Sequence, residues 1–369
     1  MEKINYVLAG AITLFVLSLM SAVIAFNYKS TALSPVSALE ECKSLSYSSP
    51  SALNLLFFSD KETAKKYSDY LLTISPYKEN KDSLNFYYVD SYQPSCELYK
   101  NVAILCYSKS LIAKAASCPH DIIIAFNNNQ QEIRSSSYLS VISINKNHPL
   151  SVFPHEMGHA LAHLAEEYVP ASLPSKQENC LSECSQFSSQ DSCFQGCSNS
   201  DLKRSIDSGI MRSLDSNTYG EYDESIILKY LLKNKQTAIT GNAVNIEEQC
   251  KNDKYYLIEA QYNSEKNKIQ VLNKELRDGC PGTSSFGDFS YNIISTQGIP
   301  IDISAFDPVS IFTDSQLETQ ETIEGALFEN TEPFFLTVPF IENAKSIEIE
   351  KNNNVLASIQ LNSNIPCQI

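Results

Sequence analysis

The chain contains no tryptophan, and its 20 tyrosines are scattered along the sequence. It therefore offers no aromatic platform on which nucleic-acid bases could stack. Basic residues are also few: 28 lysines and arginines stand against 43 aspartates and glutamates, a formal net charge of -15. Binding to a phosphate backbone needs basic patches, and none is visible, so we expect no nucleic-acid partner.

Glycine is sparse, with 11 residues, and no glycine-rich phosphate-binding motif occurs. No long internal repeat is apparent, so a repeat architecture is not expected. The composition, with 43% hydrophobic and 19% charged residues, is typical of a globular protein. At 369 residues the chain exceeds the usual size of a single core, and two domains are expected.

Residues 6–26 form a predominantly apolar run without a charged residue. At about 1.5 Å per residue, a helix of this length spans a bilayer core of about 30 Å. We therefore predict an N-terminal transmembrane helix within residues 1–29, with Lys3 inside and the remaining chain outside the cytoplasm. Secretion after cleavage of a signal peptide at Ala25 is the alternative. Residues 30–51, rich in Ser, Pro and Ala, are expected to form a stalk.

The sequence has 11 cysteines, an odd number that leaves at least one thiol without an intramolecular partner. Four of them, Cys180, Cys184, Cys193 and Cys197, lie in a segment rich in Ser, Gln and Asn. Two disulfides of open connectivity are expected there, and a structural zinc site is the alternative. The cysteine usage and the N-terminal run together indicate an oxidising, extracytoplasmic compartment.

Strand-like and helix-like segments alternate in the first half of the chain. Buried-strand patterns lie at residues 53–58, 85–89, 102–106 and 122–126. A helical pattern over residues 61–74 follows the first of them. This spacing predicts an α/β fold with a mostly parallel sheet. Residues 138–144 alternate in polarity and are expected to form an edge strand, to which a peptide substrate could pair by β-addition.

The main chemical signal is the segment His155-Glu156-Met157-Gly158-His159. On a helix, His155 and His159 lie one turn apart on the same face, so both imidazoles can bind one Zn²⁺. Glu156 then lies beside the metal and can act as general base in peptide hydrolysis. An ordinary amphipathic helix with hydrogen-bonded histidines is the alternative.

Residues 155–169 (HEMGHALAHLAEEYV), the cysteine-bearing loop, and Gly209-Ile210-Met211-Arg212 before Tyr219-Gly220-Glu221 together resemble the IgA-peptidase family of zinc metallopeptidases. The resemblance covers roughly residues 50–235. It implies a metzincin-like, three-layer catalytic domain over residues 52–240. It also implies zinc ligation by His155 and His159, a catalytic Glu156, and Met211 in a turn beneath the metal.

The third zinc ligand is predicted to be Glu166, which stands where the family pattern has aspartate. In a continuous helix Glu166 would lie too far along the axis, so the chain must turn sharply after about Ala162. His163 occupies the place where a turn glycine is expected, which makes that turn costlier. Glu167 and Glu178 remain the alternatives.

Beyond this region, residues 241–290 are expected to connect to a second domain. From residue 291 onward, short alternating runs are separated by polar turns such as Asn352-Asn353-Asn354. These runs predict an immunoglobulin-like β-sandwich over residues 291–369. Cys250, Cys280 and Cys367 can supply one disulfide there and one leftover thiol.

The sequence thus predicts a membrane-anchored, extracytoplasmic zinc endopeptidase that acts on protein or peptide substrates. Tyr168, Arg212, Tyr219 and Tyr222 are candidates for stabilising the oxyanion. A catalytically inactive surface adhesion or binding protein, built on a peptidase-like domain, is the competing hypothesis. The intact Glu156 disfavours it, because a binding protein has no chemical need for a base at that position.

Overall fold

The computed structural model describes residues 39–187, 193–232, 250–282, 286–316 and 323–361. Glu40–Ile369 forms one compact unit, distinct from Met1–Leu39. The expected membrane helix at residues 6–26 lies outside the described residues. Among the residues that are described, no helix is long and apolar enough to span a membrane.

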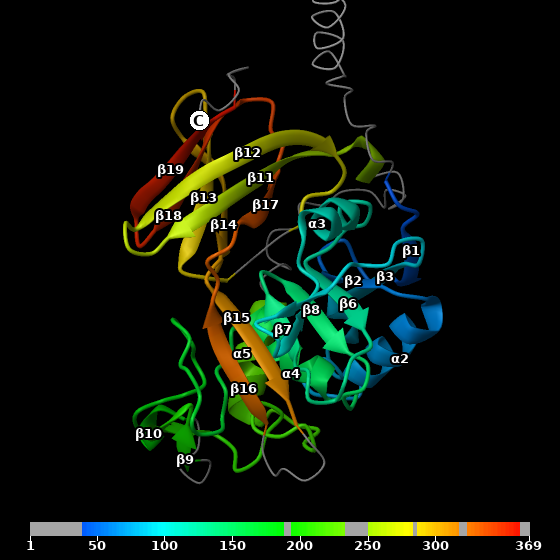
Figure 1. Ribbon diagram of the computed structural model, residues 1–369, viewed down its shortest axis with the longest axis vertical. Helices are drawn as coiled ribbons and strands as arrows, with labels where there is room; N and C mark the ends of the chain where they lie inside the picture. The colour runs from blue at the N-terminus through cyan, green and yellow to red at the C-terminus, as the bar shows by residue number, and fades with distance from the viewer. Residues whose placement is uncertain (1–38, 188–192, 233–249, 283–285, 317–322, 362–369) are drawn as a thin grey trace, which may run out of the picture. The chain divides into compact units, whose positions relative to one another are not determined.

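One eight-stranded sheet lies beside the predicted metal motif (Figure 1). Its strand order is β1-β3-β2-β6-β8-β7-β15-β16. The three pairs β3–β2, β2–β6 and β6–β8 are parallel, and the other four are antiparallel. The bounds are β1 Lys43–Ser46, β2 Leu53–Phe58, β3 Leu84–Val89, β6 Ile122–Asn127, β7 Ser135–Tyr138, β8 Val141–Asn145, β15 Ser310–Ser315 and β16 Glu324–Glu329.

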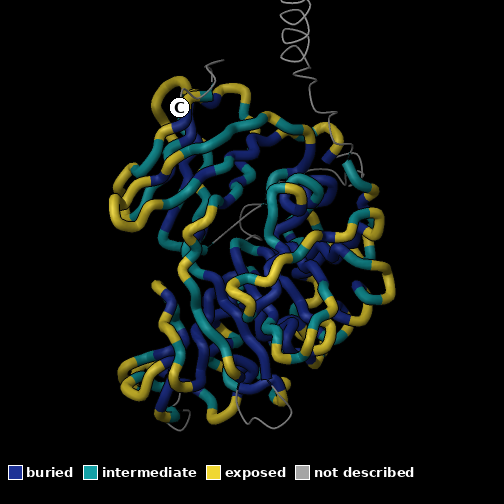
Figure 2. Tube along the Cα trace, viewed as in Figure 1, coloured by how far each residue is buried: buried dark blue, intermediate teal, exposed yellow. Residues whose placement is uncertain are grey.

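The central strands are buried on both faces because their apolar runs leave no polar side (Figure 2). In β2, Leu55 and Phe57 join one core, whereas Leu56 and Phe58 join the other. The first core also contains side chains of α2 (Lys61–Leu71), α4 (Val152–Ala162) and α5 (Glu221–Leu231). The second contains side chains of α3 (Lys109–Ala115) and of β11 (Lys254–Asn263), a strand from much later in the chain.

The local predictions for β2, α2, β3 and β6 are confirmed, with α2 ending three residues before the expected position 74. The strand expected at residues 102–106 forms as β5 (Ala103–Leu105), but it pairs with β4 (Glu97–Tyr99) in a separate two-stranded sheet rather than in the eight-stranded one. The strand expected at the sheet edge forms as β8, which lies inside the sheet between β6 and β7.

The prediction of a three-layer α/β domain with a mostly parallel sheet is wrong. The described chain is mostly β, with one mixed sheet and several antiparallel sheets. One reason is local: Leu139 and Ser140 both have positive φ and form a tight turn, so β7 and β8 pair antiparallel as a hairpin. A helical crossover, which a parallel pair requires, is absent between them.

Two further antiparallel sheets share one core. One has the order β12-β11-β17 and the other β14-β13-β18-β19. The bounds are β11 Lys254–Asn263, β12 Lys268–Asp278, β13 Phe289–Ser295, β14 Pro300–Phe306, β17 Phe334–Pro339, β18 Ala344–Lys351 and β19 Asn354–Gln360. The expected immunoglobulin-like sandwich is therefore also corrected: after β14 the chain leaves these sheets, adds β15 and β16 to the eight-stranded sheet, and returns as β17 (Figure 1).

Two disulfides close the cysteine-bearing loop, as predicted, and exclude the four-cysteine zinc site. The Cys184–Cys193 loop is nested inside the Cys180–Cys197 loop, which ends with the short strand β9 (Phe194–Cys197), and β10 (Asn199–Arg204) follows and pairs with β9. Cys367 lies outside the described residues. The five disulfides, which indicate an oxidising extracellular environment, are Cys42–Cys118, Cys96–Cys106, Cys180–Cys197, Cys184–Cys193 and Cys250–Cys280.

The disulfides should contribute unequally to stability, because the Cys42–Cys118 pair is separated by 76 residues and the Cys184–Cys193 pair by 9. In the chain-entropy account these loops correspond to about 4.5 and about 2.7 kcal/mol. Urea denaturation of the two double Cys→Ala variants should therefore show the larger loss for Cys42 and Cys118. An equal or larger loss for Cys184 and Cys193 would contradict this account.

Candidate metal centre

The predicted metal motif lies on α4, a helix buried on all sides. His155 and His159 are 0% and 2% exposed, so neither imidazole is hydrated by bulk water. Their Nε2 atoms are 3.1 Å apart. The four-residue spacing thus brings both rings to one point, as helix geometry requires.

The chain reverses at the end of α4, at the position where the sequence analysis required a turn. His163 adopts a left-handed conformation, with φ 53° and ψ 35°. The His163 amide donates to the His159 carbonyl at 3.0 Å, the 5→1 bond of an αL C-cap, and the Leu164 amide donates to the Gly158 carbonyl at 3.1 Å. The turn therefore forms without glycine at its left-handed position.

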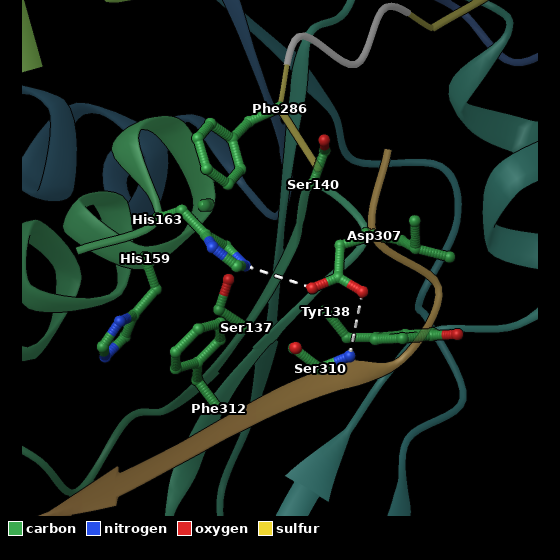
Figure 3. A pocket seen from close by; sticks show the side chains of 11 residues that line it. Ser137, Tyr138, Ser140, His159, His163, Phe286, Asp307, Ser310 and Phe312 are labelled. Carbon is green, nitrogen blue, oxygen red and sulfur yellow. Dashed lines mark hydrogen bonds and ion pairs between the residues drawn. The ribbon is translucent and has the colours of Figure 1, made fainter. Parts of the chain in front are cut away.

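Tertiary contacts hold the His163 side chain in this turn. Its Nε2 lies 3.2 Å from Asp307 Oδ2, and its ring packs on Phe286 with centroids 4.4 Å apart (Figure 3). Its Nδ1 lies 3.2 Å from the Ser175 carbonyl oxygen. His163 is thus a packing residue at the helix end rather than part of the metal cluster.

The reversal brings Glu166 back to the two histidines, and β15 adds Asp314. Glu166 Oε1 lies 3.0 Å from His159 Nε2, and its Oε2 lies 3.7 Å from His155 Nε2. Asp314 Oδ2 is 3.5 Å from both Nε2 atoms. Bonds of about 2.0–2.2 Å to a tetrahedral ion place ligand atoms about 3.3–3.6 Å apart. The four groups, all buried, could therefore hold one metal ion.

The hydrogen bonds of the imidazoles prepare them for a cation. His155 Nδ1 lies 2.9 Å from the Ile210 carbonyl oxygen, and His159 Nδ1 lies 2.7 Å from that of Leu164. Because a carbonyl only accepts, each Nδ1 carries a proton, which leaves the Nε2 atom of each ring to face the cluster. The two Nε2 atoms, 3.1 Å apart, could therefore bind one metal ion together.

The carboxylates lead to the same conclusion. Among the described residues, Glu166 Oε2 and Asp314 Oδ2 are buried without a hydrogen-bond partner. Burial, followed by the charge of Asp314, raises the pKa of Glu166. Burial opposes ionisation of Asp314, but its two histidine neighbours hold its pKa below the ordinary value. A divalent cation would balance both carboxylates and supply the partners that these oxygens lack.

Glu156 follows the first histidine and is 0% exposed. Neither carboxylate oxygen has a hydrogen-bond partner in the described part of the chain. Burial raises its pKa, and the charges of Asp314 and Glu166 raise it further. A buried carboxyl group without a partner costs free energy, and this one lies beside the metal-ligand cluster.

The turn that contains Met211 lies against α4. A Cβ atom added to Gly158 would come within 2.7 Å of Met211 Sδ, so the sulfur packs directly on the helix between the two histidines. The adjacent Ile210 carbonyl accepts the proton of His155 Nδ1, and the Met211 carbonyl accepts from the Glu167 amide at 2.9 Å. This turn therefore orients one ligand and fixes the backbone next to another.

The cystine-bearing loop holds the Glu166 segment from the other side. Asn179 bonds both backbone groups of Ala165, accepting from its amide at 2.7 Å and donating to its carbonyl at 2.9 Å. The Ser198 hydroxyl donates to the Glu166 carbonyl at 2.9 Å. The Cys180–Cys197 disulfide packs against Ala165. The loop thus positions Glu166 through its backbone.

The two alternative third ligands lie elsewhere. Glu178 forms an ion pair with Lys229 at 2.7 Å and accepts a hydrogen bond from Tyr230 at 2.8 Å. Glu167 interacts with Asp223 and Arg204, and burial raises its pKa to about 8. Neither belongs to the metal-ligand group found among the described residues.

Of the four oxyanion candidates, only Tyr168 contacts the cluster, donating from its hydroxyl to Asp314 Oδ1 at 3.3 Å. Arg212 donates to a backbone carbonyl at 2.9 Å. Tyr219 likewise bonds a backbone carbonyl, and Tyr222 packs edge-on against another aromatic ring. The residue that the sequence analysis missed is Asp314, because no local pattern signals which distant strand joins a sheet.

Comparison with known proteins adds no assignment. No protein-family model matches the chain, and no curated protein shows significant similarity to it. The chemistry of the cluster therefore follows from its own geometry.

Replacing single glutamates distinguishes the third-ligand candidates. Glu166→Ala removes a carboxylate from the cluster and should weaken zinc binding at least about 100-fold in competition with a chelator. Glu178→Ala breaks only a partly exposed ion pair and should leave zinc affinity unchanged. Full affinity in Glu166→Ala with loss in Glu178→Ala would overturn the ligand assignment.

Proposed function

We propose that this protein is an extracytoplasmic zinc endopeptidase related to the IgA-peptidase family. The observation that carries the proposal is Glu156, a buried carboxyl group without a partner, directly beside two histidines whose Nε2 atoms converge. A site that only binds metal has no use for this carboxyl group. A hydrolase needs it as the base.

Zinc is the metal that best fits the donor set. The cluster offers two imidazole nitrogens and two carboxylate oxygens, with separations near those of tetrahedral zinc ligands. Ca²⁺ and Mg²⁺ prefer oxygen ligands and six or more of them. Both histidines also donate a hydrogen bond from Nδ1 to a backbone carbonyl, as zinc-binding histidines commonly do.

The roles of the residues in peptide hydrolysis follow from their positions. A bound zinc ion would polarise the scissile carbonyl and make a water molecule acidic enough to react at neutral pH. Glu156 takes the proton of the attacking water and passes it to the leaving amine. Tyr168, the oxyanion candidate whose hydroxyl reaches the cluster, donates a hydrogen bond to the developing oxyanion.

The location of this activity is outside the cytoplasm, where the five disulfides persist. We further propose that residues 6–26 anchor the chain in the membrane, because their apolar length suits a bilayer core. The metal centre would then lie on the outer side. Secretion after cleavage at Ala25 is the competing arrangement.

One observation favours a second candidate, a non-catalytic binding protein stabilised by metal. Asp314 supplies a fourth protein ligand, and structural zinc sites are closed by four ligands whereas catalytic sites keep one position open. The two candidates differ in whether cleavage appears once this fourth position is opened.

The test compares Asp314→Ala with the double variant that also carries Glu156→Gln. The amide keeps the shape of the side chain but cannot accept the proton, so cleavage of an unfolded protein should fall by about 10²–10⁴-fold while zinc is retained. Glu178→Gln in the same Asp314→Ala background is the matched control and should cleave normally. Equal cleavage with and without Glu156, or no chelator-sensitive cleavage by any variant, would refute the endopeptidase.

A further inference from the structure

The strand β15 lies along β7, beside the metal centre. The two strands pair antiparallel, with Phe312 opposite Ser137, Thr313 opposite Ser136 and Asp314 opposite Ser135. Without β15 and β16, β7 would be the edge strand of the eight-stranded sheet. An uncovered edge strand presents unpaired amides and carbonyls to which an extended peptide can add. In this chain a segment from far along the sequence takes that place.

Asp314 reaches from β15 into the position that a catalytic metal site leaves open. Its side chain is 0% exposed, and Oδ2 lies 3.5 Å from each histidine Nε2. Its Oδ1 accepts the hydroxyl of Tyr168 at 3.3 Å. The Asp314 carboxylate thus occupies the fourth ligand position and also accepts the hydrogen bond of Tyr168, the proposed oxyanion donor.

Phe312, two residues before Asp314, points to the same face of β15 and covers the neighbouring ligand. Its ring stacks on His159 with centroids 4.2 Å apart and planes 14° from parallel. It also meets His163 edge-on at 5.3 Å. Figure 3 shows Phe312 next to both histidines, with Phe286 on the opposite side of His163. Removing β15 would uncover an apolar subsite bounded by these aromatic rings.

The hairpin of β15 and β16 is also anchored at the end where β15 stops and β16 begins. The side chain of Gln316 accepts from the Leu214 amide and bonds the Ser213 hydroxyl, and the Ile323 amide donates to the Arg212 carbonyl at 3.0 Å. These partners belong to the segment that follows Met211. The hairpin therefore packs against both β7 and the segment that follows Met211.

Gly325 on β16 makes this docking possible. A Cβ atom added at this position would overlap Asp314 Oδ1 and the Tyr168 hydroxyl, as well as the Thr313 carbonyl oxygen. A larger residue there must push Asp314 away from the metal position. This glycine offers a way to displace the hairpin without changing a ligand.

We propose that β15 is a built-in substrate mimic that keeps the peptidase latent. This proposal rests on the proposed function and names its substrate as an extended polypeptide that pairs antiparallel with β7. An aromatic or aliphatic side chain of the substrate takes the place of Phe312 against His159 and His163. Cleavage requires the hairpin to withdraw, which frees the β7 edge, the fourth metal position and the Tyr168 hydroxyl together.

The test uses the full chain loaded with Co²⁺ or Zn²⁺ and acetohydroxamate as a probe of an open metal position. In Asp314→Ala, hydroxamate should bind at least 10-fold more tightly than in the unmodified chain, with a matching change in the visible spectrum of the Co²⁺ form. Cleavage of an unfolded protein by the Zn²⁺ form should rise about 10-fold or more, because loss of the Asp314 side-chain contacts also makes it easier for the hairpin to withdraw from β7. Glu324→Ala removes an exposed acid from the same hairpin and should change neither measurement.

Gly325→Val provides a second route, because it displaces Asp314 while retaining the carboxylate. It should raise hydroxamate affinity and cleavage in the same direction. Equal hydroxamate binding in the unmodified chain and both variants would overturn latency, as would loss of the metal from both variants. Tighter hydroxamate binding without any cleavage would support the conclusion that Asp314 blocks the metal position but would refute the endopeptidase. The two proposals can therefore fail separately.

Discussion

Two imidazole nitrogens facing each other inside the protein are the constraint on which this structure depends. His155 and His159 direct their Nε2 atoms to within 3.1 Å, in a place that bulk water does not reach. A metal ion bound to both nitrogens would also balance the two carboxylates buried beside them. Metal binding here would then be coupled to folding.

The surrounding structure serves to hold the ligands in place. The turn at Met211 supplies a carbonyl to His155, and the reversal at His163 supplies one to His159. The cystine-bearing loop fixes the backbone of Glu166 through Asn179 and Ser198. Disulfides near a metal ligand stabilise its position in a compartment where they remain oxidised.

The helix of the metal motif could be predicted from the sequence because its information is local. A spacing of four residues places His155 and His159 on one face wherever the helix lies. The position of Glu166 required one further assumption, a turn at His163, and the structure has that turn without the expected glycine. Asp314 was not predictable, since its place depends on the pairing of β15 with β7 across nearly half of the chain.

The sheet was predicted less well for the same physical reason. Apolar runs locate strands such as β2 and β6, but they do not determine which strands become neighbours. A two-residue turn of Leu139 and Ser140 makes one pair antiparallel, and a hairpin from the C-terminal part extends the sheet. These non-local choices turn an expected parallel sheet into a mixed one. They also bring the fourth metal ligand to the site.

The central claim is that His155, His159, Glu166 and Asp314 bind one zinc ion. X-ray absorption at the zinc edge, combined with metal analysis of the purified full chain, tests it most directly. We predict about one zinc per chain with four nitrogen or oxygen neighbours at about 2.0–2.2 Å, two of them imidazoles. Absence of bound metal, or sulfur neighbours at about 2.3 Å, would contradict the account.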